Sequence, residues 1–453
     1  MPIDAVHPDY AARSSQWERC RDAFAGLDDV KAAGTKYLPW TRARTGPEYD
    51  DYRNRATWFG ATERTVIGLA GTIQRKATAV VVPEPMEPHL ADIDLTGTDI
   101  QGFIGQLLQA QLLVGRAAIE VSVADDGRPY WTLWPAEAIR NWRVERIAGR
   151  MMLTGLVIAD ALSQSPDPDD AWQTDTQERL REWVLTPAGV VVRSWLRTDK
   201  PDAKWEVVDE RQLVRRGEAI PGIPVIPVGA QACQWEVEKP PLLDLVDLNI
   251  AEWRNSADYE AALACIKPVY AFFGFPANTE IVLGSNRALV TELPNGSATI
   301  LQGADPAGLR AALDEKRRMM ATLGGRLLEE PQFQETATAV RMRHEGEEAT
   351  LRTIAVTMAE AVRRALAWHA YWMGLPDDQI AVTPNMDFVV ATLTPDQIRA
   401  YMELLTAGRI SYATFYALLQ GGEIARPGVS AEDELAAIER ETEQAIGTLQ
   451  ATS

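Results

Sequence analysis

The sequence predicts an α+β protein in which a strand-rich first half is followed by long helices. Three observations indicate this class. Short runs of β-branched and aromatic residues, separated by Gly, Pro and Asp, recur between residues 80 and 235. Apolar residues at helical spacing run from 241 to 264. A second helical pattern, over 336–373, would be roughly 57 Å long at 1.5 Å per residue.

The N-terminal 77 residues are predicted to be mainly helical. Residues 1–50 indicate a helix followed by an irregular arm, and residues 53–77 indicate one further helix. That second helix carries an apolar stripe beside a stripe of small residues: Ala61, Thr65, Gly68 and Thr72. A glycine inside a helix costs about 1 kcal/mol relative to alanine. The small stripe is therefore interpreted as a tight packing seam, within this chain or against a neighbouring one, or as an ordinary helix crossing.

The middle of the chain is predicted to be a helix followed by hairpins. Thr98 is the expected N-cap of a helix from Asp99 to about Val114, and Gly115 is its expected C-terminal glycine. The turn "ADDG" separates the predicted strands 116–123 and 129–134. Further strands are expected at 151–160, 180–186 and 190–196, and residues 163–170 have the composition of a surface loop.

The second half alternates helices with short irregular stretches. The expected order is a helix over 241–264, short strands and turns over 265–302, a helix over 306–328, and the long pattern over 336–373. Thr394 and Gln397 fit a capping box at the start of two short helices, for which Gly408 and Gly421 fit the ends. The last 24 residues indicate an acidic helix or a loose tail.

The charge and motif content argues against several classes of function. The formal net charge is −19, so the chain lacks the surplus of cations that drives generic DNA binding. No nucleotide-binding or hydrolase motif of the kinds GxGxxG, GxxxxGK[ST] or GxSxG occurs. The four histidines have no metal-ligand spacing, and we expect no metal, no cofactor and no catalytic residue.

Two local patterns are interpreted as structural. Residues 92–99 begin like a calcium loop, but Phe103 occupies the twelfth position, where a bidentate Glu is required. We expect a turn leading into the next helix. The two short helices at 395–420 are expected to be a packing hairpin, because the second has no Lys or Arg for DNA contact.

Membrane association and secretion are not expected. No stretch approaches the roughly 18 consecutive apolar residues of a membrane span, and the N-terminal residues lack the apolar region of a signal peptide. Three widely separated cysteines favour a reducing compartment over a disulfide framework.

An ordered set of segments resembles the portal proteins of tailed bacteriophages. These segments are "VKAAGTKYLPW" with the helix after it, "LLVGRAAIEVSVAD" through "RPYWTLWPAEAIRNWR", "LNIAEWRNSADYEAALACIKPVY", "ATLGGRLLEE" and "ETATAVRMRHEGEEATL". The resemblance covers roughly residues 7 to 420 and is nearest to a subfamily described only as a domain of unknown function. Its specificity lies in the order of the segments, since no single motif is diagnostic.

The resemblance implies a structural protein of the virion rather than an enzyme. Portal proteins form a homo-oligomeric ring, usually of twelve subunits, at one vertex of the capsid. Double-stranded DNA passes through the ring without sequence specificity during packaging and ejection. The implied partners are the terminase large subunit, the head–tail adaptor, and the major capsid and scaffolding proteins. The implied location is the virion, and the host cytoplasm during assembly.

The resemblance also implies a division of the chain into the parts of the portal fold. The expected parts are an α+β wing at 1–240, a first stem helix at 241–264, a clip at 265–304, a second stem helix at 305–328, a tunnel loop at 329–337, a long wing helix at 338–374 and a helical crown region at 375–453.

The two predicted stem helices carry opposite charges. The first has acidic residues and the second has basic residues, so each stem could pack against the stem of the next subunit in a ring. The expected inter-subunit residues are Asp244, Asp247, Glu252, Asp258, Arg310, Lys316, Arg317 and Arg318. Two solvated helix faces remain the alternative.

The clip and the tunnel loop are the expected contact segments. Short strands with unpaired edges favour partner contacts in the clip, for which Asn278, Glu280, Asn286 and Arg287 are the candidates. A self-contained hairpin is the alternative.

Pro331 breaks the helical pattern, so a loop is predicted there, and in the portal fold this loop projects into the DNA channel. The expected channel residues are Glu329, Glu330, Pro331, Gln332, Phe333, Gln334 and Glu335.

Other functions remain open at the level of sequence. The tunnel loop could be an ordinary turn between two helices, with Phe333 in the core. The protein could be another capsid or connector component without a DNA channel. It could also be an enzyme with an unfamiliar site.

Overall fold

The computed structural model describes residues 2–40, 45–164, 175–197, 204–266, 269–273, 296–301, 305–325, 337–388, 395–422, 424–426, 429–438 and 440. The fold is mixed α+β, which confirms the predicted class. The chain forms two compact units, Met1–Asn385 and Met386–Ser453. None of the described helices is both long and apolar enough to cross a membrane.

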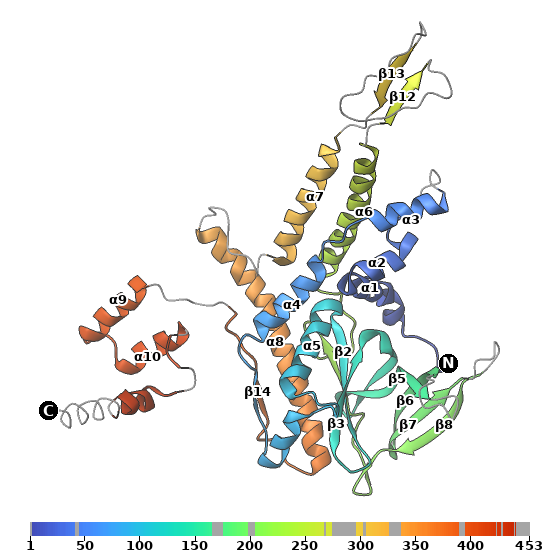
Figure 1. Ribbon diagram of the computed structural model, residues 1–453. Helices are drawn as coiled ribbons and strands as arrows, with labels where there is room; N and C mark the ends of the chain where they lie inside the picture. The colour runs from blue at the N-terminus through green and yellow to red at the C-terminus, as the bar shows by residue number, and fades with distance from the viewer. Residues whose placement is uncertain are drawn as a thin grey trace, which may run out of the picture. The chain divides into compact units, whose positions relative to one another are not determined.

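Short helices open the first unit (Figure 1). They are α1 (Pro8–Ala25), α2 (Leu27–Ala32), the 3-10 turn η1 (Gly34–Lys36), α3 (Gly46–Arg55) and α4 (Ala61–Ile73). The prediction of one helix over 53–77 is therefore wrong. The backbone is extended at Ala56, with ψ of 134°. The amide of Thr57 donates to Ser256 Oγ at 2.9 Å, so a tertiary hydrogen bond takes the place of a helical one.

A central apolar helix, α5 (Ile100–Val114), packs against α1, α4 and α8. Its N-cap is Asp99, whose carboxylate accepts a hydrogen bond from the amide of Gly102 at 2.9 Å, and not Thr98 as the sequence had indicated. Its end matches the prediction, because Gly115 adopts the left-handed conformation with φ of 70°. Before α5 lie β1 (Ala79–Val81), the 3-10 helix η2 (Glu84–Ala91), and the predicted turn over 92–99.

A three-stranded antiparallel sheet lies beside α5 and α8. Its order is β11 (Val225–Gly229), β2 (Arg116–Val123) and β3 (Pro129–Pro135), and the 3-10 turn η3 (Ala136–Ala138) follows it. The predicted hairpin of β2 and β3 is confirmed. Trp131 on β3 is 1% exposed and belongs to the core.

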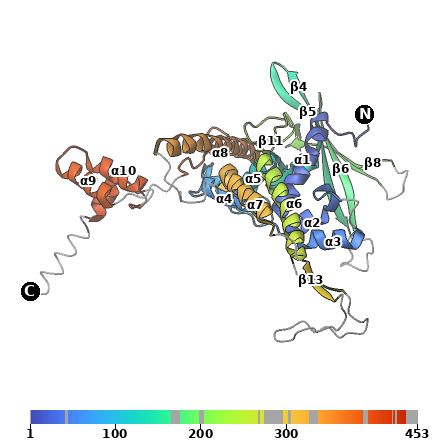
Figure 2. The ribbon, with the colours of Figure 1, turned by 90° about the horizontal axis from the view of Figure 1, so that it is seen from above.

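A five-stranded antiparallel sheet follows in the chain (Figure 2). Its spatial order is β4 (Ile139–Ile147), β5 (Arg150–Gln164), β6 (Asp175–Thr186), β7 (Gly189–Leu196) and β8 (Glu206–Gln212). Each strand pairs with its neighbour in sequence, so the sheet is a simple meander. The two-residue strands β9 (Val214–Arg215) and β10 (Glu218–Ala219) form a small hairpin after it.

The second half of the first unit contains its longest helices. In chain order these elements are α6 (Leu243–Cys265), β12 (Val269–Phe273), β13 (Ser297–Leu301), α7 (Ala307–Met320), the π-helical turn η4 (Ala321–Gly325), α8 (Ala337–Met373) and β14 (Ala381–Thr383). Strands β12 and β13 pair antiparallel. Strand β14 pairs with β1, so residues 375–385, expected in the crown region, belong to the first unit.

The second unit contains α9 (Pro395–Thr406) and α10 (Tyr412–Gly421), which contact each other as the predicted hairpin. Gly408 has φ of 66° directly after α9, in agreement with its predicted role as a helix end. The side chain of Ser411 accepts a hydrogen bond from the amide of Thr414 at 3.2 Å and so caps α10.

Candidate functional site

Helices α6 and α7 lie side by side and run antiparallel (Figure 1). Their direction follows from their contacts. Arg317 on α7 meets Glu252 in the middle of α6, while Met320, further along α7, meets Leu245 near the start of α6. Strands β12 and β13 lie between the two helices in sequence.

A stripe of buried polar side chains follows one face of α6. Asn249, Glu252 and Ser256 recur at intervals of three and four residues and are at most 1% exposed. Asn249 Oδ1 accepts from the amide and hydroxyl of Thr62 at 3.2 and 3.0 Å, and its Nδ2 donates to Phe59 O at 2.7 Å. Asn249 therefore supplies hydrogen bonds both to the segment that separates α3 from α4 and to the first turn of α4.

Glu252 and Arg317 form the ion pair between the two helices. Nε and Nη2 of Arg317 donate to Glu252 Oε1 at 3.0 and 2.8 Å. Glu252 is fully buried, and its Oε2 has no hydrogen-bond partner among the described residues. Burial raises the pKa of Glu252, although Arg317 acts in the opposite direction. The guanidinium of Arg317 also lies 5.3 Å from the ring centre of Phe59.

Lys316 adds a second tie between the helices. Its Nζ donates to the carbonyl oxygen of Ala251 at 2.9 Å. Burial lowers the pKa of Lys316, against the attraction of Glu252. Lys316 and Arg317, which are adjacent on α7, therefore both connect this helix to α6 within one chain.

The other charged residues expected between subunits have varied surroundings. Asp247 pairs with Arg19 at 2.8 Å, Asp244 pairs with Lys239 at 2.6 Å, and Asp258 accepts a hydrogen bond from the Tyr52 hydroxyl at 2.6 Å. Arg318 lies 3.9 Å from Glu315 with a side chain that is 81% exposed, and Arg310 is also exposed. Glu252 and Arg317 are engaged with each other inside the chain, and the role of the whole set between subunits stays a prediction.

The small-residue stripe of α4 packs within the chain at its first two positions. Ala61 clusters with Leu245 and Met320. A β-carbon added to Gly324 in η4 would lie 2.6 Å from Cγ2 of Thr65. This part of the stripe is therefore a close helix crossing inside the first unit.

Two sets of predicted residues lie outside the described residues. These are the tunnel-loop residues 329–335 and the clip residues Asn278, Glu280, Asn286 and Arg287. Strands β12 and β13 confirm the expectation of short strands within 265–302.

Two neighbouring cavities lie beside β5 and β11, the smaller of about 490 Å³ against the C-terminal half of α8 and the larger of about 650 Å³ against β4 and residues 233–236. Both are lined by Leu153, Pro227, Trp235 and Arg364. Cys233 lines the larger one, but its thiol donates to the carbonyl of Thr357 and burial raises its pKa to about 11. A thiol in this state is a poor nucleophile at neutral pH. Among the described residues, no group of three or more His, Cys, Asp or Glu side chains could hold a metal ion.

Sequence reasoning missed Asn249 and Ser256 as the residues that join α6 to the segment before α4. A signal existed in the spacing of Asn249, Glu252 and Ser256, which puts three polar side chains beside the apolar face of one helix. Their partners lie 187 and 199 residues away in the chain, and nothing local points to them.

The comparisons with known proteins give one family match and several similar structures. The model of a family described as a domain of unknown function, DUF4055, matches residues 241–373, which span α6 to α8. No curated protein matches the sequence.

The similar solved structures come from particles of a gene transfer agent. A chain from the neck of the native particle, with C12 symmetry, is 15% identical over 79% of this chain and 89% of that chain, with a TM-score of 0.43. A chain from the virion of the native particle is 14% identical over 86% of this chain and 98% of that chain, with a TM-score of 0.44. Both are distant likenesses.

Proposed function

We propose that this protein is a portal protein of a tailed-phage-like particle. Copies of the chain form a ring, usually of twelve, at one vertex of the capsid. Double-stranded DNA passes through the ring during packaging and ejection. The outer end of the ring is a docking platform for the terminase large subunit and later for the head–tail adaptor.

The observation that carries this proposal is the order of elements from α6 to α8. An antiparallel helix pair is joined through a pair of short strands, and a π-helical turn and a helix of 37 residues follow it. The portal resemblance implies this succession of stem, clip, stem, loop and long wing helix. The family match covers the same residues.

The charge of the chain supports a channel through which DNA slides. Phosphate neutralisation by Lys and Arg dominates the affinity of proteins for DNA. With a net charge of −19 in each copy, a ring of this protein would hold phosphates weakly. Weak contact allows the duplex to move along the axis in both directions.

The proposal assigns roles to the segments that carry the predicted contacts. Residues 329–335 surround the moving DNA, and the clip residues at 265–304 contact the motor and the adaptor. The remaining partners are the major capsid and scaffolding proteins. The protein then belongs to the virion and, during assembly, to the host cytoplasm.

DNA packaging by a triple variant tests the proposal. We expect Gln332→Lys, Gln334→Lys and Glu335→Lys together to leave assembly intact and to slow packaging, most strongly at low salt, because the added contacts are electrostatic. Glu206→Lys with Asp209→Lys is the control, since it adds the same total charge at two exposed positions of β8.

The result also separates the alternatives. Wild-type packaging by the triple variant at every ionic strength would mean that residues 329–335 do not meet DNA. A connector without a DNA channel is distinguished by electron micrographs, because its assembly would have no hole on the axis.

A further inference from the structure

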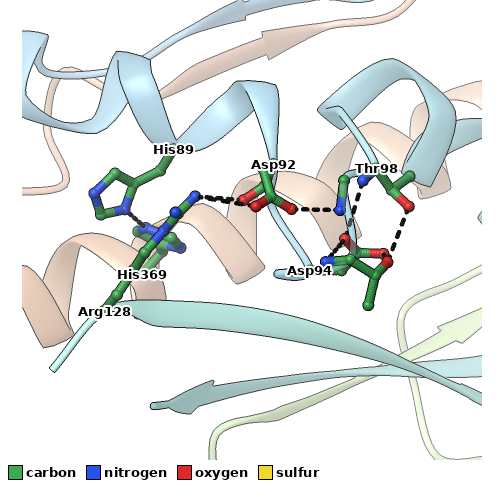
Figure 3. Close-up of polar contacts among 8 residues, drawn as sticks. His89, Asp92, Asp94, Thr98, Arg128 and His369 are labelled. Carbon is green, nitrogen blue, oxygen red and sulfur yellow. Dashed lines mark hydrogen bonds and ion pairs between the residues drawn. The ribbon is translucent and has the colours of Figure 1, made fainter. Parts of the chain in front are cut away.

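Two histidines from distant parts of the chain bond to each other inside the first unit (Figure 3). Nδ1 of His89, on η2, lies 2.8 Å from Nε2 of His369, on α8. His369 has no solvent exposure, and its Nδ1 has no partner among the described residues. Two ring nitrogens at this distance need one donor and one acceptor, which two neutral rings supply when one nitrogen of the pair carries its hydrogen and the other does not.

The surroundings of the pair favour this neutral form. Trp131 on β3 presents its ring to His369 at a centroid distance of 6.5 Å. Arg128, just before β3, carries the positive charge that acts on both rings. Its Nη2 donates to the carbonyl oxygen of Asp92 at 2.6 Å and lies 3.9 Å from a carboxylate oxygen of Asp92.

Few acidic groups are available to stabilise a protonated ring. The Asp92 carboxylate accepts from the amide of Gly97 at 2.8 Å and faces Arg128, and Asp94 accepts from Thr96 and Thr98. Helix α5 and strand β14 contribute no charged residue. The other charged side chains on η2 are Glu84 and Glu87, and the charged residues of α8 that are nearest to His369 in sequence, Arg363 and Arg364, are both paired with Glu360.

We propose that the His89–His369 pair is an acid-sensitive latch that holds residues 84–99 against α8. At neutral pH the hydrogen bond between the rings closes the latch. Protonation of one ring places an uncompensated positive charge in this buried site beside the Arg128 guanidinium, and protonation of both rings leaves two donors facing each other. The latch then opens and gives both rings access to water, while α5 and the sheets stay folded.

The direction of the pH effect follows from the two states. Burial, together with His89 and Arg128, lowers the pKa of His369 from 6.5 to about 3, and burial also lowers the pKa of His89. When the latch is open, the two histidine rings bind protons below about pH 6.5. When it is closed, they do not. Closure is therefore favoured above pH 6.5 and weakens as the pH falls from 6.5 towards 3.

Hydrogen exchange of the full-length protein measures the latch directly. Between pH 7.0 and 4.5, after correction for the intrinsic rate, the protection of amides in 84–99 should fall at least tenfold and up to about a hundredfold. Amides such as Ile93, which bonds Thr98 O at 2.9 Å, report closure. Peptides from α5 are the internal control and should keep their protection.

Two variants separate a titrating latch from a merely structural contact. His369→Gln keeps polar groups that can bond His89 but removes one of the two titrating rings, so its protection should depend on pH less steeply than that of wild type. Arg128→Gln removes the repelling charge and should give a smaller loss of protection than wild type. Equal losses in His369→Gln and wild type, or no loss in wild type, would overturn the proposal.

A measurement on the wild-type protein covers the case in which a variant does not fold. Exchange of the histidine C2 hydrogen, followed by mass spectrometry against pH, gives the pKa of each ring. The latch requires an apparent pKa for His369 that lies well below 6.5. A pKa near 6.5, without loss of protection in 84–99, contradicts it.

Discussion

Gly324 in η4 and Thr65 in α4 touch without space for another carbon atom. A β-carbon at position 324 would lie 2.6 Å from Cγ2 of Thr65 and 3.0 Å from Cδ2 of Leu245. Thr65 is only 3% exposed, so it has little room to move. The π-helical turn that ends α7 can pack this closely against α4 because Gly324 has no side chain.

Gly324→Ala should destabilise the protein by about 1–3 kcal/mol, because the added methyl group overpacks this contact. Thr65→Ala in the same chain should restore part of that loss. Gly71→Ala is the control. Gly71 lies in α4, like Thr65, and has open space at its β-carbon, so the substitution should stabilise the protein by up to about 1 kcal/mol. Urea unfolding followed by circular dichroism measures all four proteins; equal effects at 324 and 71 would refute the packing argument.

Arg317→Met should cost about 2 kcal/mol, because it leaves the buried Glu252 carboxylate without its donor. The partial exposure of Arg317 keeps the loss below that of a fully buried pair. Arg318→Met removes the next cation of α7, which is 81% exposed, and should change stability by less than about 0.5 kcal/mol. Similar losses in both variants would mean that the ion pair contributes nothing specific.

The cost of Arg317→Met should also depend on pH. The pKa of Glu252 is already raised above 4.5 by burial, and loss of Arg317 raises it further. The folded variant then keeps a proton that the unfolded chain releases above about pH 4.5, so its stability falls as the pH rises through this range. We expect the gap in unfolding free energy between wild type and variant to shrink below pH 4.5. A gap that is constant from pH 4 to 7 would contradict the assignment.

Glu120 joins the three-stranded sheet to the five-stranded sheet of the first unit. It is 3% exposed and accepts hydrogen bonds from Trp134 Nε1 at 2.8 Å and from Arg181 at 2.8 and 3.2 Å. Glu120→Ala should cost about 3–5 kcal/mol, since it leaves a mostly buried guanidinium unpaired. Glu210→Ala breaks the exposed pair with Arg193 and should cost less than about 1 kcal/mol. Thermal or urea unfolding of the two variants compares them, and the prediction fails if their order is reversed.

The sequence predicted those parts of the fold that local signals determine. The end of α5 was predictable because a left-handed residue there favours glycine, and Gly115 is the first candidate after an apolar helical pattern. The long helix α8 was predictable from its period. The break between α3 and α4 was not, because Ser256, 199 residues away, supplies its hydrogen bonds. The contact of His89 with His369 spans 280 residues and leaves no periodic trace in either segment.

For the candidate site, the sequence indicated the charges but not their partners. Opposite charges on α6 and α7 were evident from composition. Glu252 and Arg317 meet within one chain because the antiparallel register brings them together and because Glu252 faces the core rather than solvent. The register between the two helices and the side of α6 that faces the core both depend on tertiary packing. The helical period of a sequence does not determine them.

The mass and shape of the purified protein test the central proposal most directly. Native mass spectrometry or light scattering, with electron micrographs of the same sample, should find a closed assembly of about twelve times the 50.0 kDa chain with a hole on its axis. A single species of 50.0 kDa under all conditions, including the presence of capsid and scaffolding proteins, would contradict the assignment as a portal.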